Sequence, residues 1–270
     1  MKLNTGEAWA DATSMISNNR EPVLVLAGLF LFLPLMVLIL ALLGADIDFG
    51  ASGSEPNPEL IAEQINGVLV QYWWAILLVA IGQICGVIAL LGLLGDHRKP
   101  TVRDVIAAIP KLILTIIAAQ IIGTIVVQAL PLLAGLLPPA VGAVVNILAL
   151  PVTIYLSVKL MLASAVVVIE KQLNPIKALK GSWELTKGNS FRIFLFFFLI
   201  TIAAIVIGIV TFLILGLILA AIGGQVQVIG SAVFISAVVA AYYAISYALQ
   251  AAIYRQLSGP SNEAMAETFE

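Results

Sequence analysis

The sequence predicts an all-α integral membrane protein with six transmembrane helices, arranged as three hairpins that each follow a cytoplasmic amphipathic helix. The first observation is composition: 61% of the 270 residues are hydrophobic and 10% are charged, against roughly 45–50% and about 25% in soluble domains. The second is six apolar runs of membrane-spanning length, and the third is a one-sided distribution of basic residues. A chain this apolar cannot cover its surface in water, so its solvent is the bilayer.

Composition also excludes several classes of protein. Disorder requires low hydrophobicity and high charge, and a net charge of −2 provides no basic field for nucleic acid. The single cysteine, Cys85, has no partner for an intramolecular disulfide and is expected to be a buried filler. The single histidine, His97, lies in a short polar loop without neighbouring ligands. We therefore expect no metal, no cofactor and no nucleic-acid partner.

The six spans follow from the apolar runs. A helix needs about 20 apolar residues to cross a core of roughly 30 Å. The runs are continuous, whereas barrel strands alternate polar and apolar residues. Proline removes a backbone donor, so Pro34, Pro131 and Pro151 are expected kink sites. The spans are expected near 23–43, 68–94, 112–136, 141–169, 191–221 and 228–253.

Charge orients the six spans. The 46–67 connection holds five acidic and no basic residues, and the 137–140 and 223–227 connections hold no charge. Twelve of the thirteen basic residues fall on the opposite side: Lys2, Arg20, Arg98, Lys99, Arg103, Lys111, Lys171, Lys177, Lys180, Lys187, Arg192 and Arg255. Because cytoplasmic loops collect Lys and Arg, we expect a multi-pass protein of the inner (cytoplasmic) membrane with both termini in the cytoplasm.

An amphipathic helix is predicted over 174–187. Asn174 is a good N-cap, Pro175 a good first helical residue and Gly188 a good terminator. Its apolar face is Ile176, Leu179 and Trp183, opposite Lys177, Lys180, Glu184 and Lys187. This pattern is typical of a helix in the headgroup plane, with Trp183 as its anchor.

Two further segments suggest a threefold plan. Residues 101–109 begin with a Thr101–Asp104 capping box and end before Pro110, which is expected to reset the chain. Residues 5–18 place Trp9, Ala12 and Ile16 on one face. The chain is thus one membrane domain, of which 255–270 form a polar tail, and the alternative to repeats is three unrelated loop helices. The predicted pseudo-repeats are 5–94, 101–169 and 174–254.

The 174–194 segment, NPIKALKGSWELTKGNSFRIF, carries a resemblance. Its proline, its Ala-Leu-Lys step and its Ser-Trp-Glu-Leu-Thr-Lys-Gly-Asn run before a Phe-rich span resemble a recurring segment of bacterial membrane proteins. That group is the membrane domain found beside glycerophosphoryl diester phosphodiesterases, with related six-span proteins. In the fused enzymes a separate soluble domain performs hydrolysis, and this chain has no soluble stretch of that length. The resemblance therefore implies a membrane domain and no enzymatic activity.

Polar residues inside the spans are the candidate functional residues. Lys159 lies eleven residues before Glu170, about 16 Å along a helix, and a lysine near the midplane costs about 2.5–3.5 kcal/mol. It is either functional or accommodated by snorkelling, and we expect it to point into the bundle or a partner. Gln120, Thr124 and Gln128 share one helix face, which indicates either hydrogen bonding between helices or a polar cavity. The candidates at similar depth are Lys159, Gln83, Gln120, Thr124 and Tyr243.

The basic side of the chain predicts contact with anionic lipid headgroups, each cation contributing about 1 kcal/mol. Topology alone also accounts for these charges. The residues expected at headgroups are Arg98, Lys99, Arg103, Lys177, Lys180, Trp183, Lys187 and Arg192. Spacings such as Gly82-xxx-Gly86 and Gly216-xxx-Ala220 let helices approach closely, although a chain with 21 glycines has them by chance.

Three functions compete. A non-enzymatic scaffold or accessory subunit, contacting lipids or a membrane partner, fits the short loops and the absence of catalytic residue sets. A carrier or lipid-handling protein with a midplane cavity around Lys159 fits the shared depth of the polar residues. Against the carrier, the predicted hairpins share one orientation, whereas carriers commonly have inverted repeats. An intramembrane enzyme lacks paired carboxylates, a Ser/His pair or a metal set.

Overall fold

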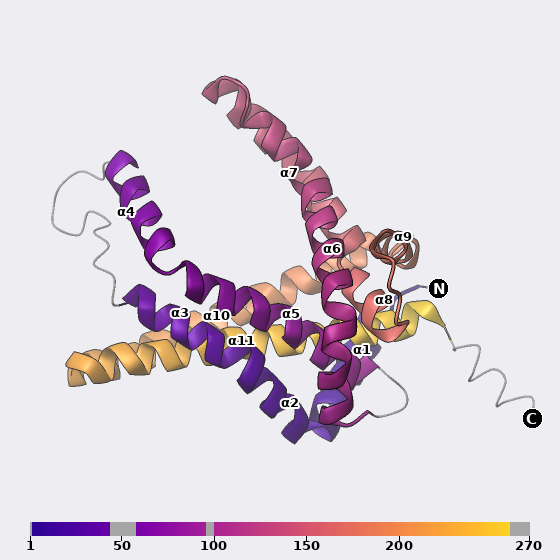
Figure 1. The fold of residues 1–270 in the computed structure, drawn as a ribbon, viewed down its shortest axis with the longest axis horizontal. Helices are drawn as coiled ribbons and strands as arrows, with labels where there is room; N and C mark the ends of the chain where they lie inside the picture. Colours follow the sequence, from indigo (N-terminus) through magenta and orange to yellow (C-terminus); the bar gives the residue numbers. More distant parts are fainter. Residues whose placement is uncertain (1, 44–57, 96–99, 260–270) are drawn as a thin grey trace, which may run out of the picture. The chain divides into compact units, whose positions relative to one another are not determined.

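The computed structural model describes residues 2–43, 58–95 and 100–259, with backbone alone for 58–62. The described part is helical throughout and contains no strand (Figure 1). In chain order the helices are α1 (Thr5–Asn18), α2 (Arg20–Ala27), the π-helical η1 (Gly28–Phe32), α3 (Leu33–Leu43), α4 (Pro58–Gln71), α5 (Trp73–Gly95), α6 (Val102–Ala134), α7 (Pro139–Leu160), α8 (Ala163–Ile169), α9 (Pro175–Leu185), α10 (Ser190–Ile222) and α11 (Gly224–Ser258).

Six helical stretches are long and apolar enough to cross a membrane, as the sequence predicts. They are Arg20–Leu43, Trp73–Gly95, Val102–Ala134, Pro139–Ile169, Ser190–Ile222 and Gly224–Ser258. Their length and composition identify the chain as a multi-pass membrane protein.

Two predicted boundaries are wrong. The second span begins at Trp73 and not at 68, because α4 occupies 58–71 and the chain bends at Tyr72. The predicted break at Pro110 is absent, since α6 runs through it from Val102 to Ala134. A proline withdraws only one backbone donor, and a long helix bonded on both sides tolerates that loss. The 101–109 segment is therefore the first part of helix α6 and not a separate helix.

Other local predictions are confirmed. Asn174 caps α9 through bonds from the Ile176 and Lys177 backbone amides to its Oδ1. Thr101 and Asp104 form a reciprocal capping box, and α1 spans residues 5–18 as predicted. These features depend on neighbouring residues, so local sequence specifies them.

The chain divides into two compact units. The first comprises residues 1–23, 87–203 and 244–270. Within it, α6 and α7 run side by side, and α9 packs on α8, α6 and α7 (Figure 1). The N-terminal segment enters its core, whose buried members are Leu3, Ala8, Val158, Leu162, Ile193 and Ile253.

The second unit comprises residues 24–86 and 204–243. A Cβ added at Gly82 would strike the Phe30 carbonyl oxygen, and one at Gly86 would lie 2.6 Å from Leu31 Cδ2. Gly82-xxx-Gly86 is therefore a close helix contact, whereas Gly216 meets only Phe212 of its own helix. Cys85 is buried, as predicted.

Candidate polar groove

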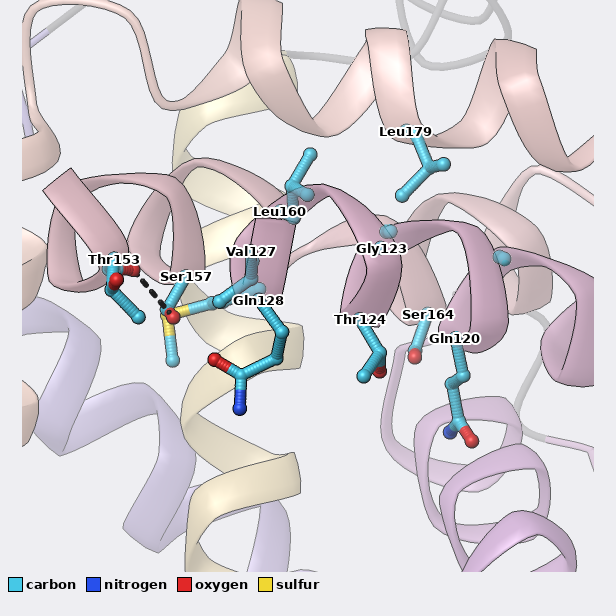
Figure 2. Close-up of a pocket in the computed structure, with 13 residues that line it drawn as sticks. Gln120, Gly123, Thr124, Val127, Gln128, Thr153, Ser157, Leu160, Ser164 and Leu179 are labelled. Carbon is cyan, nitrogen blue, oxygen red and sulfur yellow. Dashed lines mark hydrogen bonds between the residues drawn. The ribbon is translucent and has the colours of Figure 1, made fainter. Parts of the chain in front are cut away.

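A cavity of about 590 Å³ opens between α6, α7, α8 and α9 in the first unit (Figure 2). We call it the polar groove because six of its lining side chains carry amides or hydroxyls and none carries a charge. Its lining residues are Ala119, Gln120, Gly123, Thr124, Val127, Gln128, Thr153, Ser157, Leu160, Met161, Ala163, Ser164 and Leu179.

Helix α6 supplies one wall. Gln120, Thr124 and Gln128 recur every fourth residue, so they form a row about 12 Å long. All three side chains are exposed, and Figure 2 shows them on one side of the helix. Within the described residues none of them makes a side-chain hydrogen bond, so their donors and acceptors are available to a ligand.

Helices α7 and α8 supply the other wall. The Thr153 hydroxyl donates to the Ala149 carbonyl (3.0 Å) and the Ser157 hydroxyl to the Thr153 carbonyl (2.8 Å; Figure 2). Because the hydrogens are used within the helix, these oxygens face the groove chiefly as acceptors. Ser164, from α8, is half-buried. The groove can therefore both donate, through its amides, and accept.

A break in the fourth span shapes this wall. Helix α7 ends at Leu160 and α8 begins at Ala163. The fully buried Ser182 of α9 bridges the break: its hydroxyl donates to the Lys159 carbonyl (2.7 Å) and accepts from the Leu162 amide (3.1 Å). Ser182 thus pairs with two backbone groups at the break, of which the Lys159 carbonyl also accepts a longer bond from the Thr186 hydroxyl (3.5 Å), and it fixes the adjoining groove residues.

Lys159 lies at this break but does not line the groove. Its side chain is 3% exposed, and its Nζ lies 5.5 Å from the Tyr155 ring centroid and 5.2 Å from that of Trp183. The two rings meet edge to face, 6.0 Å apart. The sequence placed Gln120 and Tyr243 at a depth similar to that of this ammonium, whereas the structure surrounds it with aromatic faces, which attract a cation through their quadrupoles.

The structure thus brings together only part of the predicted polar set. Gln120 and Thr124 line the groove. Gln83 and Tyr243 fall in the second unit. Sequence reasoning missed Thr153 and Ser157, although their spacing of four residues in the fourth span is the same signal that identified the α6 row.

The rest of the 174–194 segment holds the N-terminal residues. Asn189 Oδ1 accepts from the Leu3 amide (2.9 Å), and Arg192 Nη1 donates to the Leu3 carbonyl (3.3 Å). Gly188 has φ +80°, a conformation that favours glycine. This segment therefore joins the α7–α8 break to the start of the chain.

The predicted headgroup residues are distributed over several elements. Arg103 lies in the first turn of α6, and the exposed Lys177 and Lys180 lie on α9 with Trp183, which is 39% exposed. Lys187 follows α9 and is exposed, and Arg192 lies in the first turn of α10. Arg98, Lys99 and His97 lie outside the described residues. Among the described residues no three His, Cys, Asp or Glu side chains gather as metal ligands would.

Comparison with known proteins identifies one family. Residues 133–258 match the family described as the membrane domain of glycerophosphoryl diester phosphodiesterase. The match covers the α7–α8 wall and the whole 174–194 segment, so the predicted resemblance is confirmed, and it extends to the membrane domain alone. Neither the curated proteins nor the solved structures contain a match.

Proposed function

We propose that this chain, similar over residues 133–258 to a membrane domain of that family, is a non-enzymatic scaffold or accessory subunit of the membrane. We further propose that the polar groove receives a transmembrane helix of a partner protein. The observation that carries the proposal is the open row of Gln120, Thr124 and Gln128.

Hydrogen bonding supports a protein partner. In hydrocarbon, unpaired amides are costly, so polar side chains there face protein or water. Glutamine, serine and threonine side chains are the groups that hydrogen-bond between membrane helices. A partner helix carrying such side chains would satisfy Gln120, Thr124 and Gln128 together.

The shape of the groove supports the same occupant. A row of polar groups about 12 Å long matches two turns of a facing helix, and the small residues Ala119, Gly123 and Ala163 along the groove allow a backbone to approach. The groove also carries no charge with which to fix an anionic headgroup.

A second candidate function is a carrier or lipid-handling protein. The volume of about 590 Å³ favours it, since ligand sites commonly measure about 300–1,000 Å³. In this version the ligand would contact the amides and hydroxyls of the groove, and Lys159 would support the wall from behind without touching the ligand.

We also propose that both termini are cytoplasmic in the inner membrane and that α1 and α9 lie at the headgroups. The support is that Leu3 contacts Asn189 and that the Asn4 amide donates to Gln256 Oε1 of α11 (3.3 Å), which places the two ends of the described chain together. In a Cys85→Ser background, Gln225→Cys should react with an impermeant maleimide in intact cells, and Lys180→Cys only after permeabilisation. The reverse pattern would overturn this topology.

Photo-crosslinking tests the groove. A benzophenone amino acid at position 120 should give one protein adduct of defined mass in native membranes. The matched control is position 125, where the exposed Ile125 lies on the same helix outside the groove. An adduct of lipid mass at 120 but not at 125 would replace the first function with the second. Equal adducts at both positions would contradict both.

A further inference from the structure

A second cavity, of about 420 Å³, lies where α5, the start of α6, α8 and the 170–173 loop meet in the first unit. We call it the basal pocket. Its charged members are Asp104, Lys111 and Lys171. Its apolar members are Ile88, Val105, Leu112, Val168 and Leu173. It shares no residue with the polar groove.

One oxygen of the Asp104 carboxylate can still accept a hydrogen bond. Thr101 donates to Asp104 Oδ2 twice, from its backbone amide (2.9 Å) and from its hydroxyl (2.7 Å). Both bonds use the same oxygen, so Oδ1 keeps its lone pairs. The capping box also fixes the direction of the carboxylate, which is therefore prepared to accept from a donor in the pocket.

Lys171 has an unusual backbone. Its φ is +54°, a left-handed conformation that costs a residue with a Cβ free energy and that glycine normally adopts after a helix. Its neighbours are tied on both sides: the Tyr254 hydroxyl donates to Glu170 Oε1 (2.8 Å), and the Thr115 hydroxyl donates to the Leu173 carbonyl (3.2 Å). The fold thus places a lysine beside the basal pocket, at a position whose left-handed backbone conformation glycine would adopt at a lower cost in free energy.

We propose that the basal pocket binds the headgroup of an aminophospholipid such as phosphatidylethanolamine. Lys111 and Lys171 supply two cations for the phosphate, and Asp104 accepts from the primary ammonium. The apolar members lie beside the lipid's glycerol and acyl carbons, which favours a membrane lipid over a soluble phosphate ester. Two cations and one anion in one pocket match a zwitterion better than they match a simple anion.

Selective lipid retention tests the proposal. The purified chain is mixed in detergent with equimolar phosphatidylethanolamine, phosphatidylcholine and phosphatidylglycerol. Native mass spectrometry then identifies which lipid remains bound. We expect phosphatidylethanolamine to be retained about tenfold over phosphatidylcholine, whose quaternary ammonium has no N–H to donate. Soluble phosphoethanolamine at the same concentration should compete poorly. Effective competition would move the ligand to a soluble phosphate ester and overturn the lipid assignment.

Variants separate the three charged groups. Lys111→Gln and Lys171→Gly should each reduce phosphatidylethanolamine retention about tenfold. Lys171→Gly removes the backbone strain, so its melting temperature should not fall and lost binding cannot be ascribed to misfolding. Asp104→Asn should bring the ratio of phosphatidylethanolamine to phosphatidylglycerol to about one.

The matched control is Lys180→Gln, which removes the same charge from an exposed site of α9 outside the pocket. It should leave retention unchanged. Equal retention of the three lipids by the parent chain, or an equal loss in Lys180→Gln and Lys111→Gln, would overturn the proposal. Neither result bears on a partner helix in the polar groove, because that test reads crosslinks at position 120.

Discussion

The basal pocket and the polar groove take residues from different parts of helix α6, and the chemistry of each cavity depends on its position along that helix. The basal pocket takes residues 104–112 of α6 and carries three charges, whereas the polar groove takes residues 119–128 and carries amides and hydroxyls alone. A charge near a capped helix end can reach water or headgroups, but within the span it costs several times as much as a neutral polar group. Position on the helix thus decides which ligand chemistry each cavity can offer.

Lys159 is a charged residue close to the uncharged polar groove, so its position tests this difference between the two cavities. The fold keeps its ammonium out of the groove and between the rings of Tyr155 and Trp183. Aromatic faces stabilise the cation without presenting it to a ligand. The groove therefore remains uncharged although a lysine lies one residue before its wall residue Leu160.

The largest expected effect comes from Ser182→Ala, which should disrupt the polar groove and leave the basal pocket intact. It leaves the Leu162 amide unpaired in a buried site and the Lys159 carbonyl with only a long bond from the Thr186 hydroxyl (3.5 Å), at a cost of about 2–4 kcal/mol. The melting temperature in one detergent should fall by roughly 6–10 °C, and crosslinking at position 120 should weaken.

Ser190→Ala is its control, since the Ser190 hydroxyl donates to the Thr186 carbonyl in a half-buried site. It should cost less than about 1 kcal/mol. Equal losses in the two variants would show that the bridge across the α7–α8 break has no special role.

Thr115→Val should have a smaller effect than Ser182→Ala, and it should disturb the basal pocket while it leaves the polar groove intact. It keeps the shape of the side chain but removes the bond to the Leu173 carbonyl, which costs about 1 kcal/mol. Because that bond ties the loop of Lys171, phosphatidylethanolamine retention should fall while crosslinking at position 120 persists. Loss of both readouts would mean that the two cavities are not independent.

Lys159→Leu should have the smallest effect on stability. Removing the ammonium relieves a desolvation cost that is at most about 2.5–3.5 kcal/mol, the value at the centre of a span, and it forfeits cation–π attraction to two rings, each about 1–2 kcal/mol. These contributions nearly cancel, so the melting temperature should move by less than about 3 °C. A large fall, or loss of the position-120 adduct, would give Lys159 a direct role in the groove.

Local sequence predicted much of this structure because its causes are local. Apolar length predicts the six spans, and side-chain caps predict the starts of α6 and α9. The threefold repeat stays a prediction. The predicted break at Pro110 is wrong because the loss of one backbone hydrogen-bond donor does not end a long helix.

The sites were harder to predict because they depend on tertiary contacts. The match in depth between Lys159, Gln120 and Tyr243 ignored rotation about each helix and the break at 161–162. No sequence pattern predicts the left-handed Lys171 or its shared cavity with Lys111. Likewise, Gly82 and Gly216 have equivalent spacings, and only the first meets another helical segment.

The bridge made by Ser182 has a consequence for the order of membrane insertion. The fourth span contains two backbone groups whose partner lies twenty residues or more further along the chain. When this span first leaves the ribosome and begins to enter the bilayer, Ser182 is still behind it in the chain and α9 has not yet folded against the break. The break gains these hydrogen bonds only when α9 docks, so complete integration of this span depends on a later segment of the chain and not on hydrophobicity alone.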